Sequence, residues 1–219
     1  MTLSNLMLSI VATMALGMAV GSTSLVISQQ PTAVISIPSD DATMGGGFSM
    51  NLPTSFTHRQ AELLAMSYDV AKQDGHKYPQ LLQGILLQET HAGELASYKV
   101  AGQEFGLKAN ERYYGIFQVK LSAAREVLSK YPTLIEEYQF QSTTDEEIIA
   151  KLIENDHFSI AVASKYILIL KSYGYDTMKQ LAIAYNQGPA GARGKNAEVN
   201  KYSLGVMAHI QSLRFKDKV

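Results

Sequence analysis

The chain has 219 residues and is 46% hydrophobic, which is enough for one well-packed domain with an extension but too little for two sizeable domains. Its 19 basic and 20 acidic side chains leave a formal charge of -1, so no long-range field would hold it on nucleic acid or on an anionic membrane surface. It has no cysteine, and its five histidines show no paired spacing of metal ligands, so we expect neither disulfides nor a metal site.

The first segment of the chain has the composition of a membrane-directed sequence. Leu6 to Ile27 form one predominantly apolar stretch, and no charged side chain occurs before Asp40. The stretch is long enough to span a bilayer, and its small residues could also serve as a cleavage region, although the positive charge that usually precedes a signal sequence is missing. Residues 1–28 are therefore predicted to be a signal peptide or a retained membrane anchor, and a buried N-terminal helix is the third alternative.

Pro, Ser, Thr and Gly dominate residues 29–55, with consecutive glycines at 45–47. Such a composition cannot bury enough apolar surface to fold alone, so we predict a flexible linker there. The remainder, residues 56–219, is predicted to form the folded domain and to carry the function.

Helical patterns dominate this remainder. Thr57 followed by Gln60 has the spacing of a capping box, which predicts a helix that stops at Gly75. A second helix is expected from Pro79, because proline suits a first helical turn. Further helical patterns cover 122–130, 145–154, 158–173, 177–185 and 197–213, and no strong strand alternation is present. The predicted fold class is all-α, or mainly α.

A carboxylate ends the second of these helices. Leu82, Ile85 and Leu86 share one helical face with Glu89, and the Thr-His-Ala-Gly stretch that follows should end the helix. Burial without a counter-charge would raise the pKa of this carboxyl group, as a general acid requires near neutral pH. The local pattern by itself favours a simpler alternative, a glutamate that reaches water from the end of a helix.

Several separate segments, taken in chain order, change that balance. They are an apolar helix ending in Glu-Thr at 81–90, Gly-Ile-Phe-Gln-Val at 115–119 with a helix behind it, an acidic stretch and long apolar helix at 145–173, Ala-Ile-Ala-Tyr-Asn-Gln-Gly-Pro at 182–189, and Tyr202 with Val206. In this order they resemble the soluble lytic transglycosylase family. The resemblance covers about residues 79 to 209 and implies an all-α, goose-lysozyme-like domain with a cleft.

The chain departs from the family at identifiable points. Thr90 stands where serine is usual, which keeps a hydroxyl group, and Phe117 replaces the usual methionine. The stretch between Glu89 and Gly115 is longer than the family pattern, and we expect it to form an extra loop or hairpin over the cleft. The pair of motifs at 182–189 and at Tyr202 is the most specific part of the match.

The resemblance implies a peptidoglycan lytic transglycosylase in which one glutamate acts twice and no cofactor is needed. Glu89 would protonate the glycosidic oxygen between N-acetylmuramic acid and N-acetylglucosamine, while the substrate's own acetamido group meets the charge at the anomeric carbon. Ionised Glu89 would then act as base on the 6-hydroxyl of the same muramic acid, which closes a 1,6-anhydro ring.

The resemblance also assigns residues to the substrate. Expected there are Gln118 and Asn186 as hydrogen-bonding amides, Phe117 as an apolar wall, Tyr114 as a stacking ring, Tyr202 as a partner that places Glu89, and Tyr185 and Thr90 beside them. Core packing is the open alternative for Tyr114, Phe117 and Tyr202, and helix capping is the alternative for Asn186.

Two rival functions remain open at the level of sequence. A hydrolytic lysozyme, or muramidase, would need a second carboxylate to activate water, and Glu94, Glu104 and Glu111 are candidates. A non-catalytic peptidoglycan-binding protein would keep the fold without the chemistry. In each case the expected partners are glycan strands, the membrane through the N-terminal segment, and secretion-system or virion proteins. The expected location is the cell envelope, in the periplasm or anchored to the membrane, or a virion.

Overall fold

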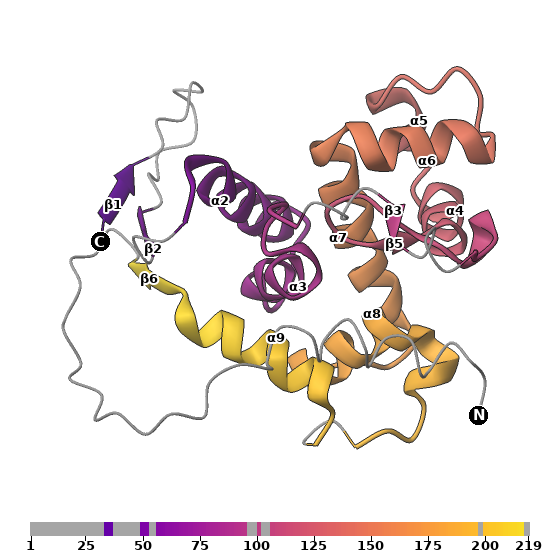
Figure 1. Cartoon of the computed structure of the whole chain (residues 1–219). Helices are drawn as coiled ribbons and strands as arrows, with labels where there is room; N and C mark the ends of the chain where they lie inside the picture. Colours follow the sequence, from indigo (N-terminus) through magenta and orange to yellow (C-terminus); the bar gives the residue numbers. More distant parts are fainter. Residues whose placement is uncertain are drawn as a thin grey trace. The chain divides into compact units, whose positions relative to one another are not determined.

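The computed structural model describes residues 33–36, 49–52, 56–95, 100–101, 106–196 and 199–216. Helices take up most of these ranges, as the sequence predicts (Figure 1). The predicted membrane-directed segment lies outside the described residues, as does most of the predicted linker. None of the helices in the described ranges combines the length and the apolar character needed to cross a membrane.

The first described helices follow the predicted signals. α2 (His58–Gln73) begins with the expected capping box, in which the Thr57 hydroxyl accepts from the Gln60 N–H at 3.2 Å and the Gln60 side chain accepts from the Thr57 N–H at 2.8 Å. α3 (Gln80–Thr90) starts directly behind Pro79, and residues 81 to 87 are all buried. Burial of consecutive residues means that α3 is covered on every side by other parts of the domain.

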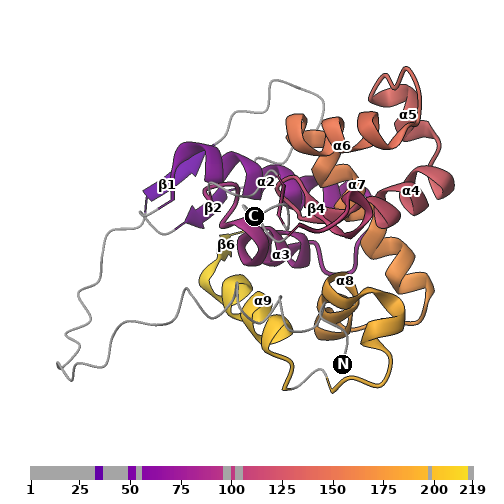
Figure 2. The same cartoon turned by 45° about the vertical axis from the view of Figure 1, so that its right-hand side comes forward.

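α7 (Asp156–Ser172) is the helix around which the others gather. It packs against α2, α4 (Leu121–Lys130), α6 (Asp145–Glu154) and α8 (Met178–Ala192), and most of its circumference is buried (Figures 1 and 2). The sequence did not predict the short helix α5 (Thr133–Glu137) before α6. α8 continues beyond its predicted end at 185 because a second helical segment follows a break at Gly188.

α9 (Lys201–Ser212) lies along α3 in both views (Figures 1 and 2). A Cβ atom at Gly84 would lie 2.9 Å from the Val206 carbonyl oxygen, and one at Gly205 would lie 2.2 Å from Oε1 of Gln88. Gly84 therefore lets the backbone of α9 approach more closely than a side chain would allow, whereas the atoms near Gly205 belong to the flexible end of Gln88.

Two small antiparallel sheets accompany the helices. Their strands are β1 (Ala33–Ser36), β2 (Ser49–Leu52) and β6 (Arg214–Lys216) in one sheet, and β3 (Val100–Ala101), β4 (Tyr113–Tyr114) and β5 (Val119–Lys120) in the other. The sequence predicted none of them, because strands of two to four residues are too short for alternation to show. β1 and β2 fall within the range predicted to be a linker, and the pairing of β3 with β4 gives the long stretch after Glu89 a hairpin-like antiparallel part.

Gly84→Ala should destabilise the domain by about 1–3 kcal/mol, because the new methyl group would overpack against the backbone of α9. Gly205→Ala is the matched control. Its methyl group would meet only the flexible end of Gln88, and alanine favours a helix by about 1 kcal/mol over glycine. Urea unfolding of both variants and the parent measures the free energy of unfolding. Equal values for the two variants would show that Gly84 does not limit the approach of the helices.

Candidate active site

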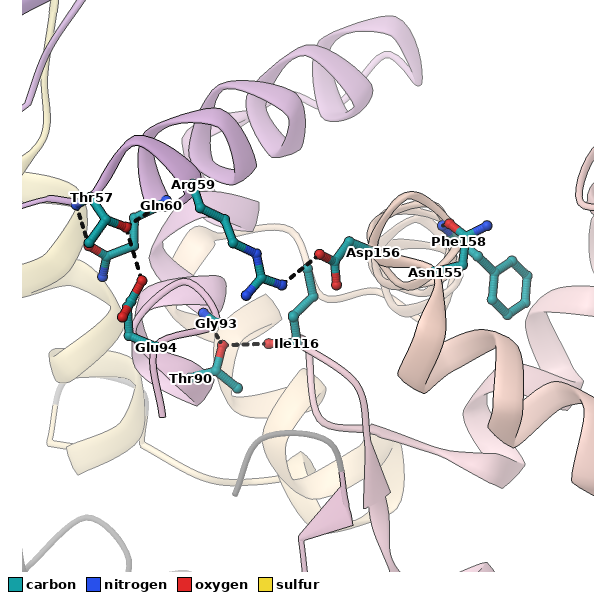
Figure 3. A network of polar contacts seen from close by, with 10 residues as sticks. All are labelled: Thr57, Arg59, Gln60, Thr90, Gly93, Glu94, Ile116, Asn155, Asp156 and Phe158. Carbon is teal, nitrogen blue, oxygen red and sulfur yellow. Dashed lines mark hydrogen bonds and ion pairs between the residues drawn. The ribbon is translucent and has the colours of Figure 1, made fainter. Parts of the chain in front are cut away.

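The turn that follows Glu89 has an unusual backbone. His91 and Ala92 take positive φ angles of 49° and 56°, and Gly93 continues with 82°. Non-glycine residues in this region cost free energy, so the surrounding contacts must hold them there. The Thr90 hydroxyl does so by donating to the Ile116 carbonyl at 2.8 Å and accepting from the Gly93 N–H at 3.0 Å (Figure 3).

Side chains from α2 hold the same turn from the other side. The amide of Gln60 donates to the His91 carbonyl at 2.7 Å. The Thr57 hydroxyl donates to Oε1 of Glu94 at 2.9 Å (Figure 3). Arg59 pairs with Asp156 at 2.9 Å, which links the start of α2 to the start of α7. These contacts fix the position at which α3 ends.

The predicted segment 115–119 forms the facing turn. Gly115 has φ +70°, and a Cβ atom there would lie 2.0 Å from the Leu152 carbonyl oxygen, so only glycine fits. Gln118 has φ +48°, and its amide nitrogen donates to the Gly115 carbonyl at 2.8 Å. The Tyr185 hydroxyl donates to the Phe117 carbonyl at 2.8 Å, which connects this turn to α8.

Three residues that were assigned to the substrate lie in the protein interior. Thr90 and Phe117 have no exposed surface, and Tyr114 keeps only 2%. Tyr114 donates its hydroxyl to the Ala109 carbonyl at 2.8 Å, and Thr90 forms the turn contacts described above. For Tyr114 and Phe117 this burial favours the alternative of core packing, and the Thr90 hydroxyl is used within the protein. Substrate contacts of the three residues stay a prediction.

Glu89 and Tyr202 meet where α3 and α9 come together. Both side chains are half-buried, and the Tyr202 hydroxyl donates to Oε1 of Glu89 at 2.5 Å, as expected. Burial raises the pKa of Glu89 to about 7, although the hydrogen bond from Tyr202 acts in the opposite direction. Burial and the charge of Glu89 also raise the pKa of Tyr202 well above its usual value, so the tyrosine stays a hydrogen-bond donor.

A cavity of about 280 Å³ lies between the segment 113–126 and residues of α7 and α8, and its volume is near the lower end for ligand pockets. Three of the predicted residues, Gln118, Tyr185 and Asn186, line it, together with Tyr113, Val119, Lys120, Ser122, Ala123, Glu126, Tyr166, Gln187, Gly188 and Pro189. Glu89 is not part of the lining. Its negative charge nevertheless raises the pKa of Tyr185, which does line the cavity, after the larger effect of burial.

The polar groups of the lining differ in how they are engaged. Asn186 is half-buried and its side-chain amide has no hydrogen-bond partner among the described residues, whereas the Tyr185 hydroxyl donates to the Phe117 carbonyl. The Asn186 amide can therefore bind a ligand without breaking a bond within the described part of the protein. A second hollow, beside His76, measures about 10 Å³ and holds one water molecule at most.

Sequence reasoning did not find three cavity residues, Lys120, Glu126 and Tyr166. The sequence could have indicated the first two as site residues, because Lys120 directly follows the motif segment 115–119 and Glu126 lies in the next helix. Tyr166 carried no such signal. It reaches the cavity from α7, where its ring makes an edge contact with Tyr185 at 5.8 Å between centroids.

In the part of the chain that the structure describes, no group of three or more His, Asp or Glu residues could hold a metal ion. No family model, no curated protein and no solved structure matches the chain. Any function must therefore be inferred from the residues and the geometry of the site.

Glu89→Gln should stabilise the domain as the pH rises. Because the folded-state pKa of about 7 lies above the usual 4.5, the carboxyl group costs no stability below the lower value. Stability is lost as pH rises from 4.5 through about 7, because the unfolded chain ionises before the folded one, and the loss levels off above 7 at a limit on the order of 3 kcal/mol. Urea unfolding at about pH 5 and about pH 8.5 should show the gap between variant and parent widening in favour of the variant. A constant gap would contradict the raised pKa.

Tyr202→Phe should raise the pKa of Glu89 further above 7, because it removes the donor that stabilises the ionised carboxylate. A titration of the Glu89 carboxyl carbon by nuclear magnetic resonance measures the change. Tyr185→Phe is the matched control, since the Tyr185 hydroxyl bonds to the Phe117 carbonyl and not to Glu89. An equal rise in both variants would mean that the tyrosine hydroxyls act only through general polarity.

Proposed function

We propose that this chain is a peptidoglycan lytic transglycosylase with Glu89 as its single catalytic acid and base. The observation that carries the proposal is a half-buried carboxyl group with a pKa of about 7 that accepts a hydrogen bond from a tyrosine. A cavity lined by two side-chain amides and by Tyr185, whose pKa the charge of Glu89 raises, supports it. A goose-lysozyme-like domain with a cleft is part of this proposal. The mainly helical architecture and the motif resemblance support it.

The raised pKa suits the first step. Near neutral pH a large fraction of the molecules carries the proton on Glu89, which can be donated to the glycosidic oxygen of a bound strand. The bond from that oxygen to C1 of N-acetylmuramic acid breaks, and its electron pair leaves with the oxygen as the 4-hydroxyl of N-acetylglucosamine. The acetamido oxygen of the muramic acid bonds to C1 in its place.

The second step uses the same carboxyl group as a base. Ionised Glu89 takes the proton of the 6-hydroxyl, O6 attacks C1, and the bond from C1 to the acetamido oxygen breaks. The product is a 1,6-anhydro ring, no water is consumed, and Glu89 is protonated again. Tyr202 would orient the carboxylate between the two steps, and Gln118 and Asn186 would hold the sugar.

The hydrolytic alternative needs a second carboxylate that activates water. Two of its three candidates, Glu94 and Glu111, instead accept hydrogen bonds from the protein. Glu94 is exposed and accepts from the Thr57 hydroxyl, and Glu111 is exposed and accepts from the Lys108 N–H at 3.0 Å. The third candidate, Glu104, lies outside the described residues. These contacts favour a mechanism with one carboxyl group.

Such an enzyme would act at the cell wall. We place its work in the cell envelope, or in a virion, where local opening of peptidoglycan serves secretion, conjugation or phage entry. The apolar stretch at residues 6–27 supports a route to that compartment, by cleavage or by anchoring.

Mass spectrometry of the fragments released from purified peptidoglycan by the full chain tests the proposal. The parent should release 1,6-anhydromuramic products, and Glu89→Gln should lower their rate of release at least about 100-fold, because it removes the proton donor. Glu94→Gln is the matched control and should keep the parent's rate. Products with reducing ends would make the protein a lysozyme, and no products from the parent would favour a binding role.

A further inference from the structure

The cavity wall carries two opposite charges in addition to its amides and tyrosines. Lys120 stands at the junction of β5 and α4, and Glu126 follows nearly two turns into α4. Both line the same cavity as Gln118 and Asn186. A neutral sugar ring is recognised by amides and aromatic rings and needs neither charge.

Lys120 has not been neutralised by the protein. Its ammonium group lies 5.0 Å from the centre of the Tyr113 ring, and the two residues are directly opposite each other in the pairing of β4 with β5. No carboxylate among the described residues lies within ion-pair distance of Lys120. The Tyr113 ring positions the ammonium group, and its positive charge remains for a ligand.

Glu126 is held in place from one side only. Its Oε1 accepts a hydrogen bond from the Tyr173 hydroxyl and lies 3.4 Å from Nζ of Lys130. Both contacts use Oε1, and 30% of the side-chain surface stays exposed. The carboxylate is therefore oriented from outside the cavity while its other oxygen can accept from a ligand.

We propose that this cavity binds the peptide stem of peptidoglycan through Lys120 and Glu126, next to the sugar that carries the stem. The stem is joined to the lactyl group of muramic acid and offers both carboxylates and a free amine, which match the two charges on the cavity wall. The inference rests on the proposed function and makes the substrate a stem-bearing strand in preference to a bare glycan.

Binding to two forms of the same soluble strands tests the inference. One form keeps its stems, and the other has lost them to an amidase. The full chain carrying Glu89→Gln, which should bind without cutting, is expected to prefer the stem-bearing form. Adding Lys120→Met should lower the affinity for that form about fivefold, as for one partly exposed ion pair, and leave the stripped form unchanged. Glu126→Gln should act in the same direction.

Lys72→Met is the matched control, since Lys72 is an exposed lysine of α2 that does not line the cavity, and it should change neither affinity. Equal affinity for the two strand forms, or an equal loss on both from Lys120→Met, would overturn the inference. The parent is assayed in parallel for anhydro products from both forms. Cleavage of both without any effect of Lys120→Met removes only this inference, whereas cleavage of neither removes the proposed function.

Discussion

The packing of α3 against α9 is the contact on which the candidate site depends. The paired positions run in opposite directions, from Gly84 with Val206 to Glu89 with Tyr202, so the two helices are antiparallel. Without a side chain at Gly84 the helical backbones approach closely, and this approach brings the tyrosine hydroxyl to the carboxyl group. The same contact removes water from Glu89, which is the main cause of its raised pKa.

The two turns beside this helix pair are held in costly conformations by their neighbours. Ala92 and Gln118 both have positive φ angles, which glycine would adopt at lower cost. The hydrogen bond from Thr90 to Ile116 joins one turn to the other, and the bond from Tyr185 to Phe117 joins the second turn to α8. The backbone near Glu89 is thus fixed in part by Thr90, Ile116 and Phe117, which are fully buried, and this explains why buried residues fall within the motif segments.

Sequence patterns predicted the elements that are long and carry clear end signals. The Thr57 capping box and the position of Glu89 at the end of its helix are examples. The hydrogen bond from Tyr202 to Glu89 was expected from the family resemblance alone. The motif resemblance could not separate side chains that face the cavity from those that face the core, so it left core packing open for Phe117, which proves to be fully buried. Whether a side chain faces the cavity or the core depends here on the turn at 115–119, which has positive φ angles at Gly115 and Gln118. The spacing of apolar residues in the sequence does not predict the direction of side chains in such a turn. The close approach at Gly84 was missed because a single glycine in a helix is also compatible with an exposed position.

The sequence separation of the Glu89–Tyr202 pair affects when the site can form during synthesis. The two residues are 113 positions apart, so a ribosome that adds about 5–20 residues per second needs on the order of ten seconds to make the second after the first. Through that interval α3 has no α9 to pack against, and Glu89 is neither covered nor bound by the tyrosine. The shielded carboxyl group is therefore a late product of folding, and a nascent chain that stops before the last helix carries the residue without its environment.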